Sequence, residues 1–330
     1  MPLRIIFCGT PAFAVPSLRH LQAQSDIKIV GVVTQPDRPR GRGQEMAFPA
    51  IKTAALELSL DVYQPEKIKS GEAVDYFTRL APDAVVIIAY GQIVPQSLID
   101  VPRLGWINLH ASLLPKYRGA APINWAILNG EAHTGLTTMQ IDAGLDTGPI
   151  LLRQEIEIGR DETAPDLTAR LAEAGAPLMD QTLRKLDARE ITPAPQDNSQ
   201  ATYAPPLRKN DGRIDWSQSK QVIYNRIRGL ASWPGVFTTF RGKTCRIWGR
   251  PLSEADFPNS HGALRSVAAR ASTPFSPSGT IHALNSLICV RCGETEALLL
   301  TFVQLEGRKR LTAQEFANGA RLTASDRFGS

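Results

Sequence analysis

The sequence of 330 residues has no run of about 18 apolar residues, the length that a membrane-spanning helix requires. Its first stretch, MPLRIIFCGTPAF, is apolar but reaches Gly-Thr-Pro too early for a secretory signal peptide. It also lacks the Arg- and Ser-rich amphipathic pattern of a transit peptide. These absences predict a cytoplasmic protein with no membrane partner. Apolar content of 43% and charged content of 21% are ordinary for a globular chain and argue against disordered and fibrous classes.

Cysteine is scarce. The chain has four, and only Cys289 and Cys292 form a CxxC pair. They lie in the strand-like run LICVRC, where residues three apart are about 10 Å apart and face opposite sides. No second CxxC or HxxxH completes a zinc set, and the acidic residues of DAGLDTG, 142–148, do not have the spacing of a calcium-binding EF-hand loop. We predict no disulfide and no metal site.

The glycine motifs that bind nucleotide phosphates are missing as well. The first strand-like run ends in GTPAF, residues 9–13, with a single glycine. A dinucleotide fingerprint requires G-x-G-x-x-G, and a phosphate-binding loop requires G-K-[ST]. The common nucleotide-binding proteins are therefore disfavoured, although a doubly wound sheet still binds its ligands at the carboxyl ends of its strands.

What is present in the first two hundred residues is an alternation of strand-like and helix-like runs, which predicts a Rossmann-like, mostly parallel sheet. The expected strands are short, β-branched and bounded by Gly, Pro or Asp: 3–9, 27–34, 60–64, 83–91 and 105–110. Helical spacing marks 16–24, 50–59 and 71–81. Strands over 134–141 and 148–158 and a helix over 163–187 close this domain, although Gly175 and Pro177 weaken the middle of that helix.

A change of composition divides the chain. We predict one domain over 1–188, a Pro-, Asn- and Gln-rich linker over 189–208 and a second domain over 209–330. Short strand-like runs separated by glycine-containing turns, with one helix over 311–319, predict that the second domain is a small β-barrel. Residues 205–330 carry 18 Lys and Arg against 9 Asp and Glu, and residues 1–204 carry 19 against 23. The basic half indicates a polyanionic partner or a solvated basic surface.

The strongest candidate site follows the fifth predicted strand, INLH. Asn108 and His110 are two residues apart, so both side chains point to the same side about 7 Å apart. An amide and an imidazole together suit a carbonyl oxygen that becomes an oxyanion under attack. A hydrogen-bonded structural pair at a strand end is the alternative. Asp146, or Asp142, on a loop after another strand would orient the imidazole and stabilise its charge, unless Asp142 merely caps the turn.

Ser112 allows a second enzyme class, a serine hydrolase with His110 as base. No G-x-S-x-G elbow is present, however, and Ser112 opens the turn SLLP. This turn suits a different task, that of presenting backbone groups and an apolar wall to a flat ring. Its residues are Ser112, Leu113, Leu114 and Pro115.

A basic loop, TQPDRPRGRGQEMAFP, follows the second predicted strand. Its Arg38, Arg40 and Arg42 alternate with Pro and Gly, so the loop is able to reach along nucleic-acid phosphates. A solvated loop with no partner is the alternative.

Several motifs of the sequence together resemble those of a known family. INLHASLLPKYRGAAPINWAILNGE followed by TTMQIDAGLDTGPIL is similar to the folate-dependent formyltransferases. RIIFCGTPAFA, GVVTQPDRPRGRG, RIDW and SWPGVFTTF make the likeness closest to the methionyl-tRNA formyltransferases and extend it over essentially the whole chain. Lys116 and Tyr117 stand where many members carry Arg-Trp, a conservative departure.

The resemblance implies a complete set of roles. Asn108, His110 and Asp146 match the catalytic triad, residues 112–115 match the turn that lines the folate site, and AYGQIVP matches the segment near the pterin. It implies an OB-like barrel that binds tRNA over 209–330, and a basic loop on the acceptor arm in which Arg42 is the best candidate. The formyl donor would be 10-formyltetrahydrofolate, the acceptor the α-amino group of initiator methionyl-tRNA, and the protein a monomer. The alternatives are formyl transfer to an amino sugar nucleotide and non-catalytic RNA binding.

Overall fold

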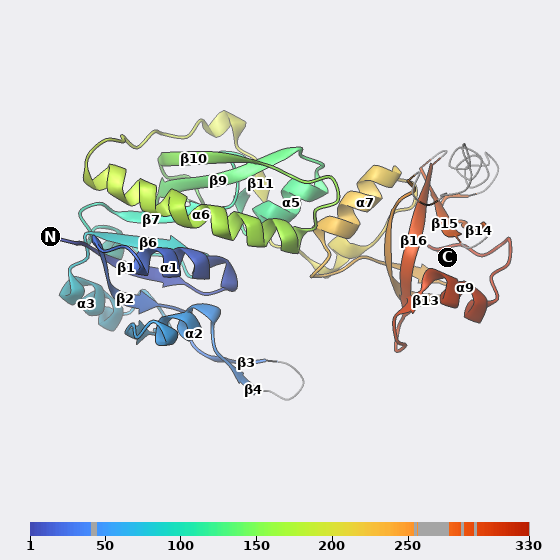
Figure 1. The fold of residues 1–330 in the computed structure, drawn as a ribbon, viewed down its shortest axis with the longest axis horizontal. Coiled ribbons are helices and arrows are strands. Elements are labelled where there is room, and N and C mark those ends of the chain that lie inside the picture. The colour runs from blue at the N-terminus through green and yellow to red at the C-terminus, as the bar shows by residue number, and fades with distance from the viewer. Residues whose placement is uncertain (41–44, 254–255, 257–276, 285–286, 294–295, 330) are drawn as a thin grey trace. The chain divides into compact units, whose positions relative to one another are not determined.

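The computed structural model describes residues 1–40, 45–253, 256, 277–284, 287–293 and 296–329 (Figure 1). These residues form two compact units. The first consists of residues 1–123, 132–158 and 166–205, and the second of 124–131, 159–165 and 206–330. The division at 1–188, 189–208 and 209–330 stays a prediction. Among the described residues, no helix combines the length and the apolar character that crossing a bilayer demands.

The first unit is built on a seven-stranded sheet in the order β10-β9-β7-β6-β1-β2-β5. Its strands are β1 (Leu3–Gly9), β2 (Ile27–Val33), β5 (Val62–Tyr63), β6 (Ala84–Ile88), β7 (Trp106–His110), β9 (His133–Gln140) and β10 (Ile150–Glu157). The five strands from β5 to β7 run parallel, and β9 and β10 are antiparallel to their neighbours. The predicted Rossmann-like, mostly parallel sheet is confirmed. The carboxyl ends of its parallel strands form one edge, where ligands bind in such sheets.

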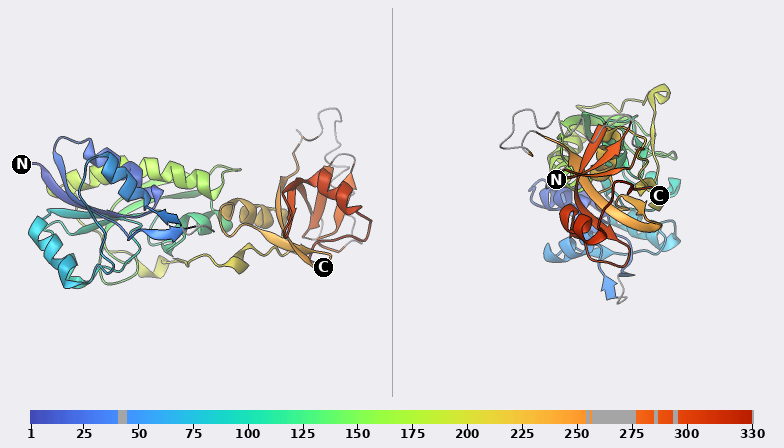
Figure 2. Two further views of the ribbon diagram at one scale, coloured as in Figure 1. Left: turned by 90° about the horizontal axis from the view of Figure 1, so that it is seen from below. Right: turned by 90° about the vertical axis from the view of Figure 1, so that its right-hand side faces the viewer.

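Helices cover both faces of this sheet. They are α1 (Val15–Gln22), α2 (Ala50–Glu57), α3 (Gly71–Leu80), the short α4 (Gln96–Ile99) and the long α6 (Ala164–Asp187). Helix α5 (Pro122–Leu128) begins in this unit, and its residues from 124 on belong to the second. Figure 2 shows α1 and α6 on one face and α3 on the other. On the α3 face, the Phe77 ring stacks on Trp106 of β7 with centroids 5.2 Å apart.

Helix α6 runs unbroken through the two residues expected to weaken it. A side chain at Gly175 would collide with Leu109 of β7, because a Cβ there would lie 2.4 Å from the Leu109 Cδ2 atom. Glycine thus lets the helix approach the sheet closely, and the burial of Leu171 and Met179 beside it offsets the weak propensity of Gly175 and Pro177. Leu109 faces α6, so Asn108 and His110 point to the opposite face.

Short elements shape the ligand-binding edge of the first unit. The strands β3 (Arg38–Arg40) and β4 (Glu45–Ala47) form an antiparallel pair, and β8 (Arg118–Gly119) pairs in parallel with β11 (Tyr203–Ala204). The 3-10 turns η1 (Ala12–Ala14) and η2 (Asn198–Gln200) complete the unit.

The second unit contains an antiparallel sheet in the order β12-β13-β16-β15-β14, with β17 paired to β16. Its strands are β12 (Phe237–Phe240), β13 (Lys243–Pro251), β14 (Ile281–Leu284), β15 (Leu287–Cys292), β16 (Glu296–Leu305) and β17 (Leu311–Thr312). Its helices are α7 (Lys220–Gly229) and α9 (Ala313–Ala320), with the 3-10 turn η3 at Lys209–Gly212. Phe328 forms an isolated antiparallel β-bridge with Phe240 of β12, and Arg327 forms one with Thr280 beside β14. The last residues therefore join both edges of the sheet, and the small barrel is confirmed.

An aromatic core fills this barrel. The Phe328 ring stacks on Trp216 at 5.6 Å and meets the edge of Phe240 at 5.8 Å between centroids. Cys289 and Cys292 of β15 are both buried and reduced, and they pack into different apolar clusters. Burial raises the pKa of both thiols to about 12.

Candidate active site

The predicted site begins at the carboxyl end of β7. This strand is hydrogen-bonded on both sides: Asn108 lies opposite Ile87 of β6, and His110 lies opposite Thr137 of β9. His110 is buried, with 6% of its surface exposed, and Asn108 is half-buried. Within the part of the chain that the structure describes, no group hydrogen-bonds the Asn108 amide. The site therefore holds a fixed imidazole beside an amide whose donors are open.

Both nitrogens of the His110 ring face acceptors. Nε2 lies 2.9 Å from the carbonyl oxygen of Tyr117, and because a carbonyl only accepts, Nε2 carries a proton. Nδ1 lies 3.7 Å from Oδ2 of Asp146. The ring is therefore held between the Tyr117 carbonyl and the Asp146 carboxylate at the edge of the sheet.

Asp146 reaches the ring from the loop between β9 and β10. Its backbone is left-handed, with φ of 51°, and its Oδ2 accepts a hydrogen bond of 2.8 Å from the Gly119 amide. Gly148 allows the loop to fold this closely, since a Cβ there would lie 1.8 Å from the Gln140 carbonyl oxygen. Asp142 instead caps the turn, accepting from the Gly144 amide at 3.0 Å. Of the two candidate carboxylates, the structure thus brings Asp146 to the imidazole.

The turn SLLP, residues 112–115, is fixed by hydrogen bonds of Ser112 and Thr137. The Ser112 hydroxyl donates to the Lys116 carbonyl at 2.5 Å, so it is engaged away from His110 and gives the serine hydrolase alternative no support. Thr137 of β9 fastens the turn: its hydroxyl donates to the Ser112 carbonyl at 2.7 Å and accepts from the Leu114 amide at 3.1 Å. Leu114 and Pro115 are buried, and Leu113 is half-buried. The folate-binding role of residues 112–115 stays a prediction, and a ligand would meet their backbone more readily than the buried side chains.

Thr137 was not among the predicted site residues. Its signal in the sequence is a polar residue inside the otherwise buried strand segment LTTMQ, where a buried hydroxyl requires a partner. This pattern indicates that the hydroxyl has a hydrogen-bond partner, but it does not indicate that the partner is the turn of residues 112–115.

The basic loop is anchored at its base. Asp37 accepts hydrogen bonds from Gln64 at 2.9 Å and from Lys52 at 2.5 Å. Both bonds lower the pKa of Asp37, and the bond from Gln64 has the larger effect. Arg38 follows on β3, exposed, with Nη2 3.5 Å from Oε2 of an exposed Glu66. Arg40 ends β3, and Arg42, the residue predicted to matter most for tRNA, lies outside the described residues.

Glutamines fill the edge between this loop and β6. Gln35 donates to the Tyr90 carbonyl at 3.2 Å, and Gln92 of the AYGQIVP segment accepts from the Ile68 amide at 2.7 Å. These residues fix the loops that follow β2 and β6 beside the expected ligand.

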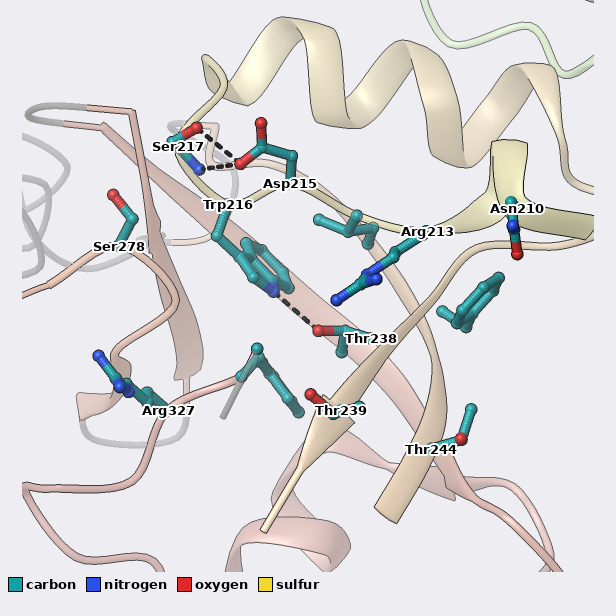
Figure 3. Close-up of a pocket in the computed structure, with 14 residues that line it drawn as sticks. Asn210, Arg213, Asp215, Trp216, Ser217, Thr238, Thr239, Thr244, Ser278 and Arg327 are labelled. Carbon is teal, nitrogen blue, oxygen red and sulfur yellow. Dashed lines mark hydrogen bonds between the residues drawn. The ribbon is translucent and has the colours of Figure 1, made fainter. Parts of the chain in front are cut away.

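In the second unit, a groove of about 760 Å³ lies on the barrel. Figure 3 shows Arg213 and Arg327 among the side chains that line it, with Trp216 between them donating to the Thr238 hydroxyl at 3.0 Å. Arg213 and Trp216 belong to the RIDW motif. Two cations at one groove are suited to nucleic-acid phosphates.

An α/β sheet with an amide, an imidazole and a carboxylate at its carboxyl edge, followed by a small barrel, defines an enzyme of the acyl-transfer type. The comparisons with known proteins agree. A model of formyl transferases matches residues 3–183, and a model of the formyl transferase C-terminal domain matches residues 206–321.

Two curated relatives are similar along their whole length. The chain is 51% identical over 328 residues to a methionyl-tRNA formyltransferase of Solibacter usitatus, covering 99% of both chains. It is 49% identical over 327 residues to the protein of that name from Koribacter versatilis, covering 98% of both. The chain therefore belongs to the formyl transferase family, among the methionyl-tRNA formyltransferases, and the resemblance seen in the sequence is confirmed.

A solved structure agrees at the level of fold. The N-formyltransferase from Helicobacter canadensis, crystallised with folinic acid and dTDP-3-aminofucose, has a TM-score of 0.60 to this chain at 16% identity, covering 91% of this chain and 99% of that one.

Proposed function

We propose that the protein transfers the formyl group of 10-formyltetrahydrofolate to the α-amino group of methionyl-tRNA. The observation that carries this proposal is the pairing of His110 with Asp146 at 3.7 Å beside the open amide of Asn108. Full-length relatives named for this reaction support it.

The amine nitrogen attacks the formyl carbon, and the carbonyl oxygen becomes an oxyanion. An α-amino group has a pKa of about 8, so a usable neutral fraction exists without a strong base. Asn108 donates to the oxyanion, because its amide has no other partner among the described residues. Both ring nitrogens of His110 face acceptors, so the ring is fixed beside the Asn108 amide at the reacting carbonyl.

The attacking amine must also lose a proton. Asp146 is placed to accept it: Oδ2 is held by the Gly119 amide, while Oδ1 has no donor within the described residues. When the tetrahedral intermediate collapses, the bond between the formyl carbon and N10 of the folate breaks, and N10 takes up a proton. One proton is lost at the amine and one is gained at the folate, so the transfer balances.

The tRNA is held by basic groups outside this centre. We assign the acceptor arm to the loop carrying Arg38, Arg40 and Arg42, and the remaining phosphate contacts to the barrel groove with Arg213 and Arg327. The monomeric state stays a prediction from the sequence. Action in the cytoplasm stays a prediction from the sequence.

The purified protein tests the proposal directly. Mixed with 10-formyltetrahydrofolate and methionyl-tRNA, it should produce N-formylmethionyl-tRNA, while free methionine and an amino sugar nucleotide should stay unmodified. Formylation of the sugar nucleotide instead would favour the related sugar enzymes. Binding of tRNA without any product would favour a non-catalytic RNA-binding protein.

A further inference from the structure

A segment assigned to the linker by its composition lies against the reaction centre. Ala194 exchanges two backbone hydrogen bonds with Ile150 of β10, at 2.8 and 2.9 Å. Ten residues later, β11 pairs with β8. Between these two attachments, the chain carries the side chain of Gln196 to the loop that holds Asp146.

The Gln196 amide is fully used. Its Nε2 donates to the carbonyl oxygens of Asp146 at 2.8 Å and Gly148 at 2.7 Å. Its Oε1 accepts from Nε and Nη2 of Arg118, at 3.1 and 2.7 Å. One amide group therefore joins the aspartate loop to the strand β8.

Arg118 depends on this amide. The residue is 3% exposed, and no carboxylate pairs with it in the described part of the chain. Its guanidinium is satisfied by Gln196 and by Oδ1 of Asn198 at 2.8 Å. A buried cation without these acceptors would be costly, so the position of β8 is coupled to Gln196.

Residues 117–119 then complete a ring of contacts. The Tyr117 carbonyl accepts from His110, and the Gly119 amide donates to Oδ2 of Asp146. Gln196 therefore acts on the pair of His110 and Asp146 from two sides. One is the backbone of Asp146, and the other, by way of Arg118, is the segment 117–119 that contacts both residues.

We propose that Gln196 is a positioning residue for formyl transfer, which holds Asp146 in its left-handed backbone conformation and in reach of His110. The inference rests on the function proposed above. Because Gln196 contacts the backbone of Asp146 rather than a substrate, it should influence turnover more than substrate binding.

Steady-state kinetics with methionyl-tRNA test the proposal. Gln196→Ala should lower kcat about tenfold or more, with KM for both substrates close to the wild-type values. Gln200→Ala is the matched control. Within the described residues, the side chain of this nearby exposed glutamine donates only to Asp197, at 2.8 Å, so the kcat of this variant should not change. A wild-type kcat for Gln196→Ala would overturn the inference.

Gln196→Glu distinguishes the accepting role of the amide oxygen from the donating role of the amide nitrogen. A carboxylate keeps an acceptor for Arg118 but loses both donors to the aspartate loop. If the loop contacts matter, this variant should remain folded and be as slow as Gln196→Ala. Wild-type turnover in Gln196→Glu would reduce Gln196 to a structural partner of Arg118 and overturn the positioning role.

A double-mutant cycle with Asp146→Asn supplies the final test. If Gln196 acts through Asp146, adding Gln196→Ala to Asp146→Asn should change kcat much less than it does in the wild-type background. Full multiplication of the two losses would contradict the proposal. A wild-type protein that fails to formylate methionyl-tRNA would instead refute the proposed function, so the two failures are distinguishable.

Discussion

Two polar regions at the same edge of the sheet differ in how they are held. Around His110 and Asp146, buried groups are locked by short hydrogen bonds from β8, from the aspartate loop and from residues 196–198. On the basic loop, Arg38 is exposed and makes one ion pair of 3.5 Å with an exposed glutamate, a contact that contributes little free energy. Stabilising an oxyanion requires donors fixed in advance, whereas attracting phosphates requires mainly charge. The comparison predicts where substitutions act on rate and where they act on binding.

The largest effect should come from the rigid region. Asn108→Ala should lower kcat about 10²- to 10³-fold, because it removes a donor to the oxyanion. The melting temperature should stay near the wild-type value, since no described group loses a hydrogen bond. His110→Ala should also lower turnover strongly. Single-turnover kinetics and thermal unfolding measure the two quantities, and a variant of Asn108 that unfolds instead of slowing would make this residue structural.

A smaller, differently placed effect is expected from the basic loop. Arg42→Ala should raise KM for methionyl-tRNA about tenfold, the loss of one charge-assisted contact, while folate binding stays unchanged. The slope of log affinity against log salt should become shallower by about 1. Lys28→Ala is the control, because this exposed cation lies near the amino end of β2, at the opposite edge of the sheet. Equal loss of tRNA and folate binding would contradict a role specific to tRNA.

The smallest effect on catalysis is expected in the second unit, within the barrel. Hydrogen bonds from Arg241 are the main cause that lowers the pKa of Asp326 to about 2. Since the folded pKa lies below the ordinary value of about 3.9, the charged Asp326 stabilises the fold above about pH 4, and this contribution is lost as the pH falls through about 2.

Arg241→Ala should therefore lower the melting temperature at neutral pH, and the difference from wild type should shrink toward about pH 2. Thermal unfolding across this pH range measures it. Turnover at low temperature should remain unchanged. A difference in melting temperature that persists undiminished in acid would assign the effect to lost packing instead.

Local patterns were sufficient for the main elements. The strand expected over 3–9 is found with those bounds as β1, because its side chains are buried on both faces and its apolar run is continuous. Asn108 and His110 were paired from their spacing, since a strand places residues i and i+2 on one side whatever surrounds it.

Helix α7 shows where such patterns fail. No helix is predicted over 220–229, yet the structure has one there. Asn225 and Arg228 interrupt its apolar face in the sequence, and both are buried. Arg228 reaches the carbonyl oxygens of Gly159 and Glu162 at 3.2 Å, partners that are more than sixty residues away in the chain. A polar residue at a core position looks like a break until its distant partner is known.

The sequence by itself determined the class of fold, the family and the two strand-borne members of the site, because periodicity and motifs act over a few residues. Only the tertiary structure decided that the Ser112 hydroxyl turns away from His110 and that Gln196, in the predicted linker, hydrogen-bonds the loop that carries Asp146. These outcomes depend on hydrogen bonds between segments as many as 78 residues apart, such as that from Arg118 to Gln196. Spacing along the chain carries no record of such contacts, since they exist only once the sheet has brought its strand ends together.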